Sequence, residues 1–141
     1  MDKISGKELI KADGSTSSVD QALADKEIVC FYFSAHWCPP CRQFTPILKD
    51  FYAEANDMGV EIIFVSSDKS HDDMISYMKE SHGDWFALKH GDDSVKELKE
   101  NFQISGIPSL IVLKKDGTLI TKEGRNHVQG KGPNAVKEWK A

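Results

Sequence analysis

The fold of this chain is decided by residues 28–41, which read Ile28-Val29-Cys30-Phe31-Tyr32-Phe33-Ser34-Ala35-His36-Trp37-Cys38-Pro39-Pro40-Cys41. Residues 28–33 are apolar and β-prone without polar alternation, as in a strand covered on both faces. Residues 39–57 then place apolar side chains three and four positions apart, which predicts an amphipathic helix. Cys38 and Cys41 are therefore expected where a buried strand passes into a helix.

The spacing and position of these two cysteines predict redox chemistry. Cysteines at i and i+3 on a first helical turn share a face and can approach disulfide geometry. Unpaired backbone N–H groups and the macrodipole at a helix start favour the thiolate, which is the attacking species. Pro39 and Pro40 suit the first helical positions, where an N–H would be unpaired anyway, and they stiffen the turn. We expect Cys38, the more exposed and ionised thiol, to attack a substrate disulfide, and Cys41, the shielded one, to resolve the mixed disulfide.

Two other interpretations of the pair are weaker. Half of a zinc site would need a second Cys-x-x-Cys or a His-x-x-x-His pair, and the sequence contains neither. The five histidines are scattered, at positions 36, 71, 82, 90 and 127. Two inert core cysteines would not need an adjoining tryptophan and two prolines. We therefore expect neither a metal ion nor a cofactor.

The composition predicts one globular domain over residues 1–141. The chain is 40% hydrophobic, and its net charge of −4 comes from 18 basic and 22 acidic residues without an evident basic cluster. Nucleic acids and anionic membranes are therefore not expected partners. The first residues lack the apolar core of a signal peptide, and no stretch approaches the roughly 20 apolar residues of a membrane helix. Three cysteines are too few for a secreted disulfide framework. We expect residence in the cytoplasm, or in the nucleus as well.

The remaining pattern along the chain predicts an α/β protein. Strands are expected at 8–11, 60–65, 109–113 and 118–121, and helices at 71–81, 93–102 and 134–139. A polar turn is expected at 13–18, and Pro46 should kink the helix that follows the cysteines. Asp116-Gly117 predicts a hairpin between the last two strands. The order of these elements indicates a central mixed β-sheet flanked by helices on both faces.

Residues 31–42, from Phe31 to Arg42, resemble the tryparedoxin and nucleoredoxin branch of the thioredoxin superfamily. The similarity continues in four further segments: Phe44-Thr45-Pro46, Val65-Ser66-Ser67-Asp68, Asp84-Trp85-Phe86-Ala87-Leu88 and Gly106-Ile107-Pro108-Ser109-Leu110. Gly117 and Gly124-Arg125 match the hairpin region of that branch. The resemblance covers about residues 7–139 and implies a thioredoxin-like fold.

The resemblance also implies substrate-binding residues. The Ile107–Pro108 bond would be cis, in a loop that faces the cysteines and offers backbone groups to an extended substrate. The substrate-binding residues would be Trp37, Pro39, Pro40, Ile107, Pro108 and Arg125, with Trp37 as a flat apolar platform beside Cys38. From the residues alone, the weaker alternatives are an ordinary pre-strand proline for Pro108 and core filling for Trp37. For Arg125, a solvated surface residue is an equal alternative.

The sequence also departs from thioredoxin proper. Tyr32 takes the place of the buried aspartate six residues before the first cysteine, as it does in the tryparedoxin branch. Asp68 is expected to cap the following helix. Cys30 and Trp85 are expected in the core, and His36 is expected to be an exposed loop residue.

The main functional hypothesis is a thiol–disulfide oxidoreductase that reduces protein disulfides through Cys38 and Cys41. The alternative is a redox-dependent protein-interaction module with little turnover, as a nucleoredoxin resemblance permits. A peroxidase is disfavoured, because the peroxidatic motif of peroxiredoxins is absent. The expected partners are disulfide-containing proteins and a reductant, either a glutathione-type thiol or thioredoxin reductase, between which the sequence does not decide.

Overall fold

Seven strands and six α-helices make up the computed structural model, which describes residue 4 and residues 6–140. The strands are β1 (Glu8–Ile10), β2 (Thr16–Ser18), β3 (Ile28–Ser34), β4 (Val60–Ser66), β5 (Phe86–Leu88), β6 (Ser109–Lys114) and β7 (Leu119–Thr121). The helices are α1 (Val19–Ala22), α2 (Pro39–Ala55), α3 (His71–Ser81), α4 (Asp93–Asn101), α5 (Gly124–Lys131) and α6 (Asn134–Lys140). A 3₁₀ turn, η1 (Asn56–Met58), follows α2.

The strands form one mixed sheet in the order β2-β1-β5-β4-β3-β6-β7. The central strands β3 and β4 are parallel, from the pair Ile28 and Val60 to the pair Ser34 and Ser66. On its other side, β3 pairs with β6 in antiparallel orientation. Every residue of β3 and β4 is buried, as strands covered on both faces require. Because parallel strands end at the same edge, the residues that follow Ser34 and Ser66 lie together there.

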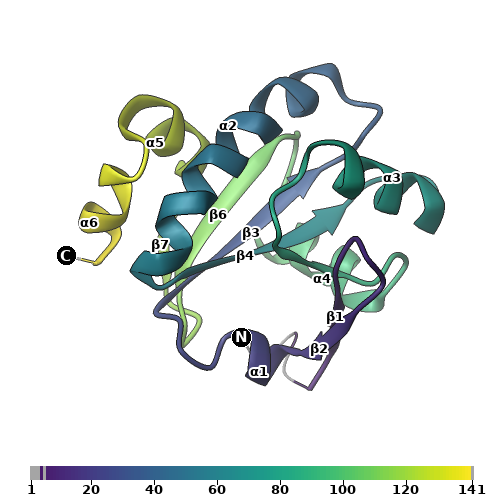
Figure 1. Cartoon of the computed structure of the whole chain (residues 1–141), viewed down its shortest axis with the longest axis horizontal. Coiled ribbons are helices and arrows are strands. Elements are labelled where there is room, and N and C mark those ends of the chain that lie inside the picture. Colours follow the sequence, from purple (N-terminus) through teal and green to yellow (C-terminus); the bar gives the residue numbers. More distant parts are fainter. Residues whose placement is uncertain (1–3, 5, 141) are drawn as a thin grey trace.

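The two faces of the sheet are covered by different helices (Figure 1). Along β3, alternate residues pack into opposite clusters: Tyr32 lies in one, and Phe31 and Phe33 lie in the other. The first cluster holds side chains from α2, α3, α5 and α6, and the second holds side chains from α1 and α4. This arrangement is the thioredoxin-like α/β fold expected from the sequence, with helices on both faces of a mixed sheet.

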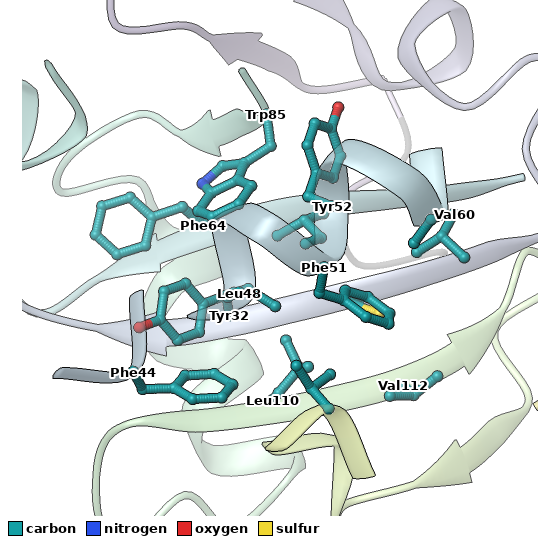
Figure 2. Packing of buried hydrophobic residues seen from close by; sticks show 14 of the residues in the cluster. Tyr32, Phe44, Leu48, Phe51, Tyr52, Val60, Phe64, Trp85, Leu110 and Val112 are labelled. Carbon is teal, nitrogen blue, oxygen red and sulfur yellow. The ribbon is translucent and has the colours of Figure 1, made fainter. Parts of the chain in front are cut away.

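The core beneath α2 is rich in aromatic side chains (Figure 2). Phe44 and Tyr52 project from α2 toward Tyr32, Phe64 and Trp85, with Tyr52 and Trp85 rings perpendicular at 5.3 Å. Trp85 is 1% exposed and Cys30 is fully buried, as expected for core residues. This packing holds α2, and with it the two cysteines, firmly against the sheet.

Several elements differ from the pattern expected from the sequence. The segment expected to be a polar turn contains β2 and leads directly into α1. The helix that follows the cysteines ends as α2 at Ala55, and its last expected residues form η1. The expected hairpin between β6 and β7 is present, but Gly124 and Arg125 lie beyond it, in α5. Short polar segments such as β2 pair through their backbone, so side-chain periodicity does not report them.

Candidate functional site

The two cysteines lie at the start of α2, where β3 ends. Cys38 is the N-cap residue of α2 with extended backbone angles, and Pro39 and Pro40 occupy the first two helical positions. The Arg42 N–H donates to the Cys38 carbonyl at 3.1 Å, so the first helical turn closes directly over Cys38. Cys41 is thereby held on the inward side of that turn.

Both thiols are free and largely shielded from solvent. Cys38 is 5% exposed and Cys41 is 0% exposed, so Cys38 is the more accessible, but it is not the open thiol that the sequence suggested. The reason is tertiary: Ala35, Cys38 and Cys41 form a buried cluster against which Ile107 packs, and the Cys38 Sγ lies 3.8 Å from the Ile107 carbonyl oxygen. The loop that carries Ile107 thus lies directly beside the Cys38 sulfur.

Cys41 is the thiol that resists ionisation. Burial, and then the hydrogen bond with the Cys38 thiol, raise the pKa of Cys41 to about 11. The Ser34 hydroxyl and the Ala35 backbone act in the opposite direction but do not offset these effects. These surroundings therefore favour the protonated form of Cys41.

A buried chain of hydroxyl groups lies beneath Cys41. The Ser34 hydroxyl contacts the Tyr77 hydroxyl at 2.7 Å, and Tyr77 in turn contacts Thr45 at 2.5 Å. Thr45 also contacts the Tyr32 hydroxyl at 2.6 Å and donates to the Cys41 carbonyl at 2.8 Å. The sequence reasoning missed this chain. Two features of the sequence could have indicated it: Ser34 is a polar residue at the end of an apolar strand, and Thr45 lies one turn after Cys41 on the inward side of the helix.

Trp37 is the exposed platform beside the cysteines. Its side chain is 57% exposed, and its indole N–H donates to the Ser67 carbonyl at 3.0 Å. That bond, rather than core packing, fixes the ring. Facing this region, the Ile107–Pro108 peptide bond is cis and Pro108 is buried. Pro39 and Pro40 are exposed on the first turn of α2.

Two residues have roles other than those expected. Asp68 does not cap α3, because Ser70 is the N-cap and accepts from the Asp73 N–H. The Asp68 carboxylate instead accepts from the His36 N–H at 2.8 Å and from the Ser66 hydroxyl at 2.7 Å. Asp68 therefore ties the loop before Cys38 to the end of β4, which only the parallel pairing of β3 with β4 makes feasible.

His36 is not a free loop residue. Its ring lies parallel to Tyr77, with centroids 5.1 Å apart, and its Nε2 lies 2.7 Å from a Glu80 oxygen. His36 thus joins the loop before Cys38 to α3.

Arg125 lies in α5, on the side of that helix that faces α2. Its guanidinium lies over the Phe44 ring, 5.9 Å from the centroid. Two clefts flank Trp37, and Arg125 lines neither of them. One cleft, of about 310 Å³, is lined by His36, Trp37, Arg42, Asp68 and Asp73. The other lies between Trp37 and the loop that carries Ile107.

Within residue 4 and residues 6–140, no three His, Cys, Asp or Glu side chains are grouped as metal ligands would be. In the same residues, no helix has the length and apolar character needed to span a bilayer.

Comparison with known proteins agrees with this geometry. A family model described as thioredoxin-like matches residues 25–119. Nucleoredoxin from Bos taurus is 39% identical over 123 residues, which are 85% of this chain and 27% of that protein. The chain thus spans about a quarter of the length of this relative.

Two solved structures superpose closely on this one. A thioredoxin from Wuchereria bancrofti has a TM-score of 0.87 and 51% identity, over 96% of this chain and 95% of the other. Tryparedoxin II complexed with glutathionylspermidine has a TM-score of 0.80 and 36% identity, over 91% of this chain and 88% of the other. With the cysteine pair at the β3–α2 junction and the cis-proline loop beside it, the chain belongs to the thioredoxin-like family of oxidoreductases, in its tryparedoxin and nucleoredoxin branch.

Proposed function

We propose that this chain reduces protein disulfides by cycling Cys38 and Cys41 between dithiol and disulfide. The observation that carries the proposal is the inequality of the two thiols. Cys38 caps the helix on the side of the Ile107 loop, whereas burial raises the pKa of Cys41 to about 11. One thiol is placed to attack, and the other is held in reserve.

The cycle balances as follows. The Cys38 thiolate attacks one sulfur of the substrate disulfide, a Cys38–substrate S–S bond forms, and the substrate S–S bond breaks to release a thiolate that takes up a proton. Cys41 then loses its proton and attacks the Cys38 sulfur. The Cys38–Cys41 disulfide forms and the second substrate thiol leaves. The substrate has gained two electrons and two protons, and the protein is oxidised.

The geometry supports the order of these steps. Once Cys38 is bound to substrate, its thiol no longer makes the hydrogen bond that helps to raise the pKa of Cys41. Ser34, whose hydroxyl contact lowers the pKa of Cys41, stays in place. Ionisation of Cys41 therefore becomes easier when a mixed disulfide is waiting to be resolved.

The oxidised protein needs a second thiol donor to complete the cycle. We propose a glutathione-type thiol or thioredoxin reductase, and the glutathionylspermidine complex of tryparedoxin II supports a donor of the former kind. We further propose cytoplasmic or nuclear residence, where such reductants are present.

The test is insulin reduction with dithiothreitol, with glutathione, or with thioredoxin reductase and NADPH. We expect activity with dithiothreitol, none in Cys38→Ser, and a trapped mixed disulfide in Cys41→Ser. Undiminished activity in Cys38→Ser would end the proposal.

The large exposed fraction of Trp37 favours the interaction module as the second candidate. Partner binding that differs between the reduced and the oxidised wild type, with little or no turnover, would establish that alternative.

A further inference from the structure

A groove of about 270 Å³ lies between Trp37 and the loop that carries Ile107. Its lining is Trp37, Ser67, Lys99, Ile104, Ser105, Gly106 and Ile107. Most of these groups are apolar or uncharged, and Lys99 alone in the lining carries a formal charge. Since the Cys38 Sγ contacts the Ile107 carbonyl, this groove adjoins the attacking thiol.

Lys99 is held in the groove by the residue that also fixes Trp37. Its ammonium donates to the Ser67 hydroxyl at 2.5 Å, while the Trp37 indole donates to the Ser67 carbonyl at 3.0 Å. The Ser67 N–H in turn donates to the Ser34 carbonyl at 2.9 Å, at the end of β3. Ser67, held at the edge of the sheet, thus positions both the Trp37 ring and the Lys99 ammonium.

The charge on Lys99 has no opposite charge beside it. Among the described residues, ion pairs engage Lys7, Lys11, Lys89, Lys131 and Lys140, but none engages Lys99. Burial also lowers the pKa of Lys99, so the ammonium has lost part of its hydration. An ammonium has three N–H donors, and Ser67 accepts from one of them. The groove therefore offers a partly dehydrated cation with unused donors next to the reactive sulfur.

We propose that Lys99 forms a carboxylate subsite, and that the chain prefers disulfides whose cysteine is flanked by an acidic residue. This inference rests on the proposed function and names the substrate class of the same site. The apolar walls take up an extended segment, and Lys99 supplies the charge complement for its carboxylate. Glutathione disulfide carries the same group, so it is a second source of the same chemistry.

The experiment measures kcat/KM with dithiothreitol as the reductant and two fluorogenic disulfide peptides that differ only by Glu or Gln beside the cysteine. Glutathione disulfide and the uncharged hydroxyethyl disulfide are tested in parallel. The proteins are the wild type, Lys99→Gln, Lys99→Glu and the control Lys96→Gln. Lys96 lies one turn earlier on α4, is exposed and does not line this groove.

We expect the wild type and Lys96→Gln to prefer the Glu peptide by about two- to fivefold, as a partly exposed charge pair allows. The preference should vanish in Lys99→Gln, reverse in Lys99→Glu and shrink in 0.5 M NaCl. If Lys99→Gln lowers kcat/KM for the Glu peptide alone, the subsite binds a peptide side chain. If Lys99→Gln lowers kcat/KM equally for glutathione disulfide, the subsite takes a carboxylate from either source.

The inference is overturned if the wild type reduces both peptides equally, or if Lys99→Gln keeps the preference. Hydroxyethyl disulfide separates this failure from a failure of the proposed function. A wild type that reduces neither this small disulfide nor either peptide lacks the proposed activity altogether. Reduction of all three substrates, with equal kcat/KM for the two peptides, removes only the subsite.

Discussion

Acidification from pH 7 to pH 5 should destabilise this protein through one buried imidazole, that of His82. The His82 side chain is 6% exposed, and its ring lies 4.3 Å from the Tyr77 ring and 4.5 Å from the Phe64 ring, centroid to centroid. Its Nδ1 accepts from the Trp85 indole at 2.9 Å, which places the proton of the neutral ring on Nε2. That Nε2 has no hydrogen-bond partner among the described residues. The site therefore accommodates the neutral imidazole but provides no hydrogen-bond acceptor for the second N–H of the imidazolium.

The direction and the size of this pH effect follow from the linkage between proton binding and folding. Burial, and then the nearby His36, lower the pKa of His82 from 6.5 to about 3 in the folded chain. Between pH 6.5 and pH 3 the unfolded chain binds a proton at this residue and the folded chain does not, so the free energy of unfolding decreases as the pH falls below 6.5. At pH 5 the gap is about 1.5 pH units, which corresponds to about 2 kcal/mol of lost stability at about 1.4 kcal/mol per unit.

Urea unfolding followed by tryptophan fluorescence at pH 7, 6 and 5 measures this loss. The wild type and the exposed-site control His71→Gln should lose about 2 kcal/mol more between pH 7 and pH 5 than His82→Gln does. The quantity compared is the change with pH, so a lower starting stability of His82→Gln does not affect the result. If His82→Gln does not fold, the wild-type imidazole resonances serve instead, and those of His82 should not titrate between pH 7 and pH 5. Equal pH dependence in all three proteins, or a His82 resonance that titrates near pH 6.5, would refute the reasoning.

Two further predictions concern packing and the hydroxyl chain. Gly124→Ala should lower the free energy of unfolding by about 1–3 kcal/mol, because its Cβ would lie 2.7 Å from the Leu110 carbonyl oxygen. Gly130→Ala in the same helix meets nothing within 4 Å and should raise the free energy of unfolding by about 0.5–1 kcal/mol. Thermal unfolding compares the two variants, and stability changes of the same sign would contradict the contact argument. Thr45→Val should cost about 1–3 kcal/mol, because it removes the hydrogen-bond partner of the buried Tyr32 hydroxyl. In a double-mutant cycle with Tyr32→Phe, urea unfolding should show losses well below the sum, and strictly additive losses would show that the two hydroxyls do not act together.

The placement of the cysteine pair was predicted correctly from the sequence because it is a local feature. Cys38 and Cys41 are three residues apart, and the apolar strand before them and the two prolines between them define the helix start on which both lie. The fold class was readable for a similar reason. Strands buried on both faces, such as β3 and β4, are continuous apolar runs, and long helices keep an apolar face.

The surroundings of the pair depend on contacts between residues far apart in the sequence, which no local pattern records. The Cys38 thiol is shielded by Ile107, 69 residues away, so its exposure could not be inferred from its place at a helix start. Asp68 resembled a helix cap in the sequence, but the pairing of β3 with β4 brings it to the His36 N–H instead.

The sequence by itself thus determined where the two cysteines lie in the fold and which runs of residues pack on both sides of a sheet, since both follow from neighbours in sequence. Tertiary structure alone decided how far each sulfur is buried, which hydroxyls lie under Cys41, and that Lys99 lies beside Trp37. Those outcomes depend on strand order and on side chains that meet only after the sheet closes. Free energies of burial and of charge are set by such neighbours in space.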